Sequence, residues 1–208
     1  MTEQIKRFSE ILKTRVKEKR YLHSLGTMEE AKTLAKIYGA DEEKATLAGL
    51  LHDITKSLTK EEHLELIRKS GKNEDPEELC CKNLLHAVTA PIVLEKELSI
   101  SDPEILSAVR LHTRAKPNMT LLEKILYIAD FTEPTREYAD ADFYRKFARE
   151  YPEKTLFLSL RWGLGDRLRK GNYIYKTTLE TYNYYIQNFD TAKYIAEYEE
   201  EHQKGSMI

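Results

Sequence analysis

The stretch LLHDITK, residues 50–56, places a histidine beside an aspartate at the end of an apolar helical run. Ionisable groups buried in a core need a partner or a metal ion, so this pair limits what the surrounding chain can build. Such pairs also arise by chance, and His52 or Asp53 alone is more simply explained as a satisfied core histidine or a helix-capping aspartate. The other histidines and one further aspartate therefore decide what the pair means.

Four of the six histidines lie at or near the ends of expected apolar helices, and Asp130 lies on a fifth such helix. In chain order the set is His23, His52-Asp53, His86, His112 and Asp130. Imidazole and carboxylate together suit iron, zinc or manganese, and the set offers no soft ligand. Because different helices carry these residues, converging helix ends would bring them together.

Apolar residues recur at helical spacing along most of the chain, and no segment alternates at the strand period. Two Thr-x-x-Glu capping boxes, at residues 59–62 and 120–123, each predict the start of a helix. We therefore expect an all-α fold. The expected helices cover residues 3–19, 28–39, 41–52, 59–71, a segment from 75, 84–98 with its start around His86, 102–112, 120–130, and three helices within 141–203 broken near Pro152, Gly171 and Asp190.

Size and composition indicate one domain. The 208 residues suffice for one sizeable core, and 41% of them are hydrophobic. With 8 glycines and 6 prolines spread over the chain, no flexible linker separates two parts of it. We predict a single domain over residues 1–208, with a core at about residues 6–188 followed by a C-terminal helical extension and a polar tail.

The charge balance excludes some partners. The chain has 33 basic and 35 acidic residues and a net charge of −2, whereas general nucleic-acid or membrane-surface binders usually carry a strong basic excess. A small anionic ligand needs only a local positive cluster. No apolar run approaches the ~20 residues of a membrane span, and no signal-peptide core is present. The adjacent Cys80 and Cys81 favour a reducing, cytoplasmic location, and a homodimer is compatible with these features.

The ordered set of histidines and aspartates resembles the HD-domain superfamily of metal-dependent phosphohydrolases, whose pattern is H…HD…H…H…D along a helical bundle. The segments that carry the resemblance are RYLHSLGTMEEAKTLAKIYGAD, AGLLHDITK, LLHAVTAP, AVRLHT and ILYIADFTEPTRE. Within the superfamily the chain is similar to the bacterial symmetrical bis(5'-nucleosyl)-tetraphosphatases over roughly residues 6–188. The resemblance implies an HD-domain helical bundle that hydrolyses an acid anhydride, converting diadenosine tetraphosphate to two ADP.

The same resemblance implies one principal metal ion. The implied ligands are His23, His52, Asp53 and Asp130. Iron, divalent or trivalent, is expected first, with manganese, cobalt or zinc as alternatives, and a hydrolytic site needs an open position for water. In some HD proteins the residues that correspond to His86 and His112 bind a second ion. In the tetraphosphatase branch they contact substrate phosphate instead, and we favour this second interpretation.

Catalytic and substrate-binding roles also follow from the resemblance. The implied catalytic residues are Asp53, Lys56, His86 and His112. The implied substrate-binding residues are Arg20, His23, Asn83, His86, His112, Asp130, Arg136, Tyr173, Ile174 and Tyr175. The last three belong to GNYIYKTT, residues 171–178, where the branch more often has histidine or proline near Tyr175. For any one charged or tyrosine residue, a solvated surface charge or a packed ring is the simpler alternative.

Two other functions fit the pattern. One is another HD phosphohydrolase activity, on cyclic dinucleotides, guanosine tetraphosphate or nucleoside triphosphates. The other is a nucleotide-binding sensor without turnover, although a pure binder has no need for a metal that activates water. His63 receives no role, because we expect it on an exposed helix.

Overall fold

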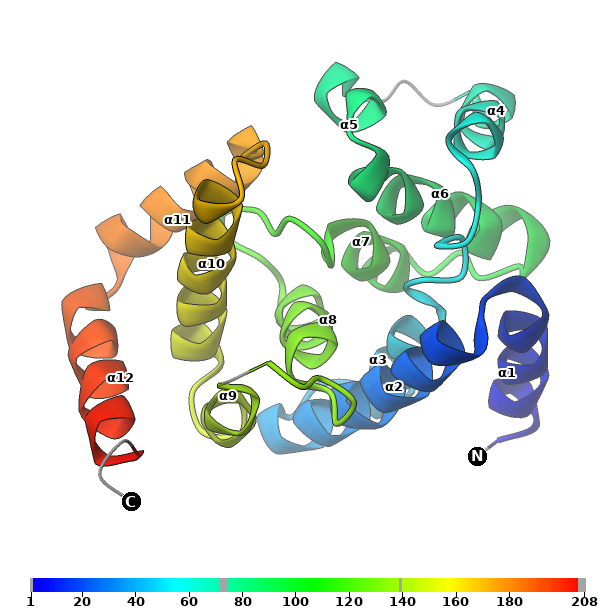
Figure 1. The fold of residues 1–208 in the computed structure, drawn as a ribbon. Helices are drawn as coiled ribbons and strands as arrows, with labels where there is room; N and C mark the ends of the chain where they lie inside the picture. The colour runs from blue at the N-terminus through cyan, green and yellow to red at the C-terminus, as the bar shows by residue number, and fades with distance from the viewer. Residues whose placement is uncertain (1, 72–74, 139, 206–208) are drawn as a thin grey trace.

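The computed structural model describes residues 2–71, 75–138 and 140–205, and these residues form helices and loops without a strand (Figure 1). The all-α prediction is therefore confirmed. The helices are α1 (Glu3–Arg15), α2 (Glu18–Tyr38), α3 (Glu42–Leu51), α4 (Lys60–Ser70), α5 (Pro76–Cys80), α6 (Lys82–Glu97), α7 (Pro103–Leu111), α8 (Leu121–Thr132), α9 (Ala141–Ala148), α10 (Pro152–Arg169), α11 (Lys176–Asn188) and α12 (Thr191–Gly205).

Most expected boundaries agree with the structure, and four differ. The first is the end of α1, which lies at Arg15 and not at residue 19, because Val16 is extended. Both predicted capping boxes are present, at the start of α4 and of α8. However, α2 begins at Glu18 and so includes His23, and α6 begins at Lys82 rather than near His86, because no glycine or proline interrupts either first turn. The C-terminal part contains four helices instead of three, since residues 141–148 bury an apolar face of their own as α9.

The centre of the fold is formed by α2, α3, α7 and α8, which pack against one another. Helices α2 and α3 approach backbone to backbone at Gly49, where an added Cβ would lie 2.8 Å from Met28 Cα. Any larger residue at this position would push the two helices apart. The close approach is important because His23 lies on α2 and His52 directly follows α3.

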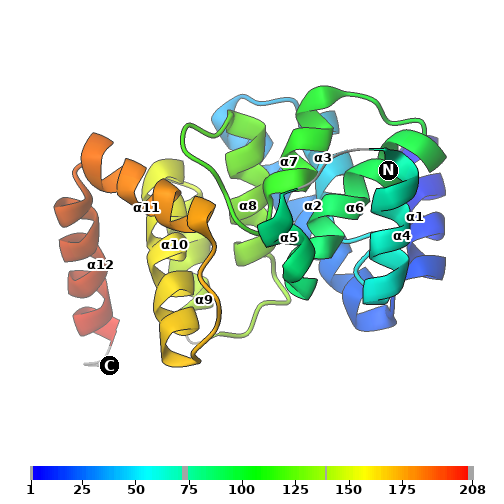
Figure 2. The same ribbon diagram turned by 90° about the horizontal axis from the view of Figure 1, so that it is seen from above.

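The C-terminal helices lie along one side of this centre. Helix α10 packs on α8 and α9, and α11 and α12 pack on α10. Seen from above, α11 and α12 are at the opposite end of the molecule from α1 and α4 (Figure 2). Helix α12 covers Thr191–Gly205, and residues 206–208 of the expected polar tail lie outside the described residues.

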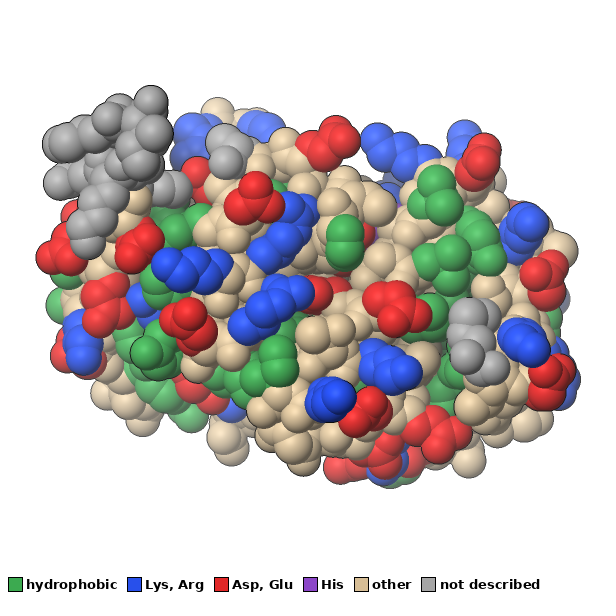
Figure 3. Space-filling view, turned by 90° about the horizontal axis from the view of Figure 1, so that it is seen from below, with side chains coloured by type: hydrophobic (Ala, Val, Ile, Leu, Met, Phe, Trp, Pro, Cys, Tyr) green, Lys and Arg blue, Asp and Glu red, His purple; other side chains and the backbone are tan. Residues whose placement is uncertain are grey.

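The surface carries charges of both signs. On the face seen from below, basic and acidic side chains are interspersed (Figure 3). Within the described residues, no helix combines the length and the apolar character that crossing a membrane requires.

Candidate metal centre and active site

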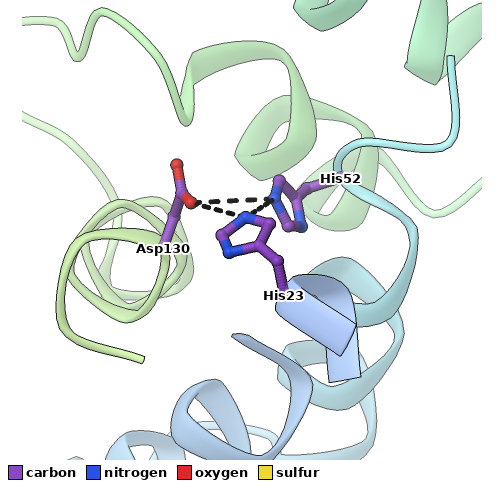
Figure 4. A group of neighbouring side chains, drawn as sticks. All are labelled: His23, His52 and Asp130. Carbon is purple, nitrogen blue, oxygen red and sulfur yellow. Dashed lines mark hydrogen bonds and ion pairs between the residues drawn. The ribbon is translucent and has the colours of Figure 1, made fainter. Parts of the chain in front are cut away.

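Three of the predicted metal ligands converge from three helices. His23 lies in the second turn of α2, His52 directly follows α3, and Asp130 lies in the last turn of α8 (Figure 4). His23 Nε2 is 3.0 Å from Asp130 Oδ1 and 3.2 Å from His52 Nε2, and His52 Nε2 is 3.8 Å from Asp130 Oδ1. Both imidazoles are buried, so solvent does not reach their contacts.

The outer nitrogens of three histidines fix the orientation of their rings. Nδ1 of His52 donates to the Gly49 carbonyl at 2.7 Å, and Nδ1 of His112 donates to the Val109 carbonyl at 2.6 Å. Nδ1 of His23 lies 2.9 Å from a carboxylate oxygen, Glu133 Oε1, to which it donates in the same way. Donation from Nδ1 leaves a lone pair on each Nε2, and such outer hydrogen bonds commonly orient metal-binding histidines.

The fourth predicted ligand, Asp53, lies between two groups of side chains. On one side its Oδ2 accepts a hydrogen bond from Arg20 Nη1 at 2.7 Å. The same oxygen lies 3.5 Å from His52 Nε2 and 3.8 Å from His23 Nε2. Asp53 therefore completes a set of two imidazoles and two carboxylates with its Oδ2 atom.

The other oxygen of Asp53 faces a different group. Oδ1 is buried and, within the described residues, accepts no hydrogen bond. His86 Nε2, Lys56 Nζ and His112 Nε2 surround it at 3.2, 3.6 and 3.7 Å. A buried carboxylate oxygen without a donor is costly unless a cation or ligand satisfies it, so its presence indicates a binding site.

Burial and neighbouring charges set the protonation of the centre. Burial opposes ionisation of Asp53 and Asp130, yet the facing histidines hold the pKa of both carboxyls well below the usual range. Burial lowers the pKa of the imidazoles His52 and His86. Burial also lowers the pKa of His23, but the carboxylates Asp130 and Glu133 beside it outweigh burial, so its pKa is raised overall. This position therefore attracts positive charge. Ionised carboxylates and neutral imidazoles are the forms that bind a metal.

A cavity of about 350 Å³ opens beside the centre, and we call it the aromatic cavity. Its aromatic lining residues are Tyr127, Phe131, Tyr138 and Trp162. Its polar lining includes six of the predicted substrate-binding and catalytic residues, namely Lys56, Asn83, His86, His112, Asp130 and Arg136. Aromatic walls with a few convergent polar groups are typical of small-molecule sites.

A second cavity of about 690 Å³ lies against the same centre, and we call it the basic groove. Its cationic lining residues are Lys17, Lys19, Arg20, Lys56, Lys82 and Arg136. His23 also lines the groove, so three predicted substrate-binding residues, Arg20, His23 and Arg136, are on this side. The aromatic cavity and the basic groove share Lys56, Arg136 and Tyr138, so the centre lies between them.

The segment Tyr173–Tyr175 lies apart from both cavities. Tyr173 is 59% exposed, and its hydroxyl donates to Glu77 Oε1 at 2.7 Å. Tyr175 is buried, with the Arg167 guanidinium carbon 4.6 Å from its ring centroid. Arg167 itself lines the aromatic cavity, so this segment supports the wall of the cavity from behind.

Sequence reasoning assigned no role to several residues of the site. Glu133 follows Asp130 by three residues within a segment that carried the resemblance, yet its buried bond to His23 could not be read from the sequence. Trp162 lies on α10 and reaches the aromatic cavity only because α10 packs on α8. No local pattern marks such a contact.

The expectation that His63 is exposed is wrong, because it is 3% exposed. It lies on the face of α4 that packs against α6, where its Nδ1 is 2.8 Å from Thr89 Oγ1. The Thr89 hydroxyl contacts the Thr55 hydroxyl at 2.9 Å, and Thr55 donates to the His86 carbonyl at 3.0 Å. Because most residues of α4 are polar, nothing in the sequence indicated that His63 is buried and connected to the site.

Comparison with known proteins agrees with this geometry. A sequence model of the HD domain matches residues 20–135, from Arg20 to just beyond Glu133. The chain therefore belongs to the HD domain family. The symmetrical bis(5'-nucleosyl)-tetraphosphatase of Halalkalibacterium halodurans is 38% identical over 84% of this chain and 92% of its own length. The protein of the same name from Bacillus subtilis is 34% identical over 84% of this chain and 94% of its own length.

A solved structure shares the fold. The crystal structure of a predicted HD superfamily hydrolase involved in NAD metabolism from Clostridium acetobutylicum has a TM-score of 0.84 and 40% sequence identity. The match covers 88% of this chain and 96% of that one. The predicted HD-domain helical bundle is therefore confirmed.

Proposed function

We propose that this chain hydrolyses dinucleoside polyphosphates and cleaves diadenosine tetraphosphate symmetrically into two molecules of ADP. The observation that carries the proposal is the position of the histidine and aspartate centre between an aromatic cavity and a basic groove. A dinucleoside polyphosphate could place one base against the aromatic walls and extend its phosphate chain past the centre toward the basic groove. The two tetraphosphatases that the chain matches over more than nine-tenths of their length support the same activity.

The centre fits a transition metal. The residues that would hold it are His23, His52, Asp53 and Asp130. The fit rests on the inward-facing lone pairs of His23 and His52 and on the two ionised carboxylates, Asp53 and Asp130. Such a metal, when bound, acts as a Lewis acid on phosphate oxygens and on water. We expect iron, with manganese, cobalt or zinc as alternatives, and one principal ion.

The residues around the aromatic cavity would stabilise the charge of the phosphate chain. Lys56 Nζ is 2.8 Å from His86 Nε2, so an ammonium and an imidazole face the same point. Arg136 is held by Asp130, with Nη2 2.5 Å from its Oδ1, and lines both cavities. His112 would contact the phosphate chain through its Nε2 edge, and Asp53 Oδ1 would accept a proton from the attacking water.

The register of cleavage would follow from the aromatic cavity. If the cavity holds one ADP unit, the second phosphate of the chain lies at the centre and the bond between the second and third phosphates breaks. Both halves then leave as ADP. Hydrolysis of diadenosine tetraphosphate in oxygen-18 water should give ADP alone, with the label in one of the two ADP molecules formed per turnover. Equal amounts of AMP and ATP would contradict this register.

The same assay separates the alternatives. Faster turnover of a cyclic dinucleotide, guanosine tetraphosphate or a nucleoside triphosphate would indicate another HD phosphohydrolase activity. Tight ADP binding without turnover in the presence of iron, manganese, cobalt or zinc would indicate a sensor. The single domain, the cytoplasmic location and the homodimer remain predictions, which cooperative unfolding, cell fractionation and sedimentation would test.

A further inference from the structure

The basic groove carries positive charge that the described residues do not neutralise. Lys17, Lys19 and Lys82 line it, and within the described part of the chain none of the three forms an ion pair or a side-chain hydrogen bond. Of the acidic lining residues, Glu133 is already paired with His23 and Arg136, and Glu137 is an exposed carboxylate, so together they offset little of this charge. The groove therefore favours an anion.

Two helices begin at this groove without a side-chain cap. Helix α2 follows Lys17 and α6 begins at Lys82, and in neither does the N-cap side chain accept a hydrogen bond from the first turn. The six other described helices up to residue 132 each begin with a Thr or Asp that caps the first turn. Free amides at a helix N-terminus carry partial positive charge and bind phosphate. Both uncapped ends thus add to the charge of the lysines.

The groove continues from the site of the reaction. It shares Lys56 and Arg136 with the aromatic cavity, and His23 of the centre lines it directly. The groove is also the larger of the two cavities, about 690 Å³ against 350 Å³, and both volumes are in the range of small-molecule sites. A phosphate chain that leaves the aromatic cavity past the centre would enter the groove.

We propose that the basic groove binds the phosphate chain of the nucleoside diphosphate unit that departs. This inference rests on the proposed function. In the hydrolysis, the oxygen of water bonds to phosphorus of the half held in the aromatic cavity, and the bridging P–O bond breaks. The electron pair of that bond stays on the departing phosphate, while water loses its proton to Asp53 and then to solvent. The charge that develops on the departing half is therefore formed next to Lys17, Lys19 and Lys82.

Binding of ADP, the product, tests the groove without turnover. Calorimetry should show two ADP molecules per wild-type chain, a tighter one in the aromatic cavity and a weaker, salt-sensitive one in the groove. The double variant Lys17→Ala/Lys19→Ala should weaken the second site about tenfold or more, because each contact to phosphate is charge-assisted. It should also raise the KM for diadenosine tetraphosphate more than it lowers kcat. The single variant Lys82→Ala should act in the same direction.

A matched control is available on the same helix. Lys32→Ala/Lys36→Ala removes the same charge from exposed positions of α2 that do not line the groove, and it should leave both ADP sites as in the wild type. All the lysines changed are exposed, and circular dichroism will show that α2 remains helical. Equal ADP affinities in the Lys17/Lys19 variant and the control would overturn the proposal, and so would one ADP per wild-type chain.

These experiments distinguish failure of the groove proposal from failure of the proposed hydrolysis. A wild type that binds two ADP molecules but does not cleave diadenosine tetraphosphate would leave the groove assigned and the activity wrong. A wild type that makes ADP alone, with a KM that the lysine substitutions leave unchanged, would keep the activity and remove the groove.

Discussion

The two oxygens of Asp53 face groups that differ in charge. Around Oδ2 are His23, His52, the Arg20 guanidinium at 2.7 Å and, beyond the imidazoles, the second carboxylate Asp130. Around Oδ1 are two imidazoles and the ammonium of Lys56, without a second carboxylate among the described residues within 4.0 Å of these groups. Carboxylates attract a cation, whereas an ammonium repels one and attracts phosphate.

This difference bears on how many ions the centre holds. The ligand atoms of His52, Asp53 and His112 also lie within 4.8 Å of one another, so geometry alone would permit a second ion. The Lys56 ammonium, 3.6 Å from Asp53 Oδ1, opposes a cation at that position. Arg20 likewise lies 2.7 Å from Oδ2, but of the described carboxylates Asp130 adds a second negative charge on that side, which supports one principal ion there and substrate phosphate on the Oδ1 side.

The largest effect on activity is expected from substitution of His52 or Asp53, the adjacent pair at the centre. We predict that His52→Ala and Asp53→Ala each lose the bound metal and lower turnover by about a thousandfold or more, since each removes a proposed ligand. Metal analysis and product assay on protein purified without chelator will measure both. Circular dichroism should still show a helical protein. His63→Ala removes another buried histidine and should keep its metal, and full metal content and rate in either ligand variant would disprove the assignment.

An intermediate effect is expected on the Oδ1 side. We predict that His112→Ala keeps most of its metal but loses about a hundredfold in rate or substrate affinity, because the imidazole would contact phosphate rather than the ion. The metal content per chain and the kinetic constants should be determined together. Loss of one metal equivalent from a wild type that holds two would show that His112 is a ligand of a second ion.

The smallest effect is expected from substitution of Glu133, which contacts the proposed ligand His23 and not the ion. Glu133→Gln keeps an oxygen near His23 Nδ1 but removes the charge that supports it, so we predict about a tenfold loss of metal affinity. The rate at saturating metal should change less. Titration with a competing chelator measures the affinity. Glu137→Gln, an exposed neighbour, is the matched control, and equal affinities in the two variants would show that Glu133 only fills space.

The helices could be predicted because their signals are local, and the central cluster because the order of its residues resembles the HD-domain pattern. Capping boxes, Gly39 and Pro134 mark helix ends, and helix ends carry His52, His112 and Asp130. The start of α6 was misplaced because no cap residue marks it.

The walls of the site could not be predicted in the same way. Trp162 reaches the aromatic cavity, and His63 reaches Thr89, only through the packing of one helix on another. The basic groove likewise combines the first turn of α2 with that of α6, which are more than 60 residues apart in the chain. Such juxtapositions depend on tertiary contacts, which have no local pattern.

The close approach of α2 and α3 at Gly49 has a consequence for how this protein tolerates change. The spacing of His23 and His52 is set by main chain against main chain, and not by the sizes of intervening side chains. Apolar residues elsewhere in the core can therefore exchange for others of similar volume, at a cost in stability, while the two imidazoles keep their separation. Such exchanges in the surrounding core therefore leave the centre unchanged, whereas a change at Gly49, whose carbonyl also accepts the hydrogen bond from His52 Nδ1, does not.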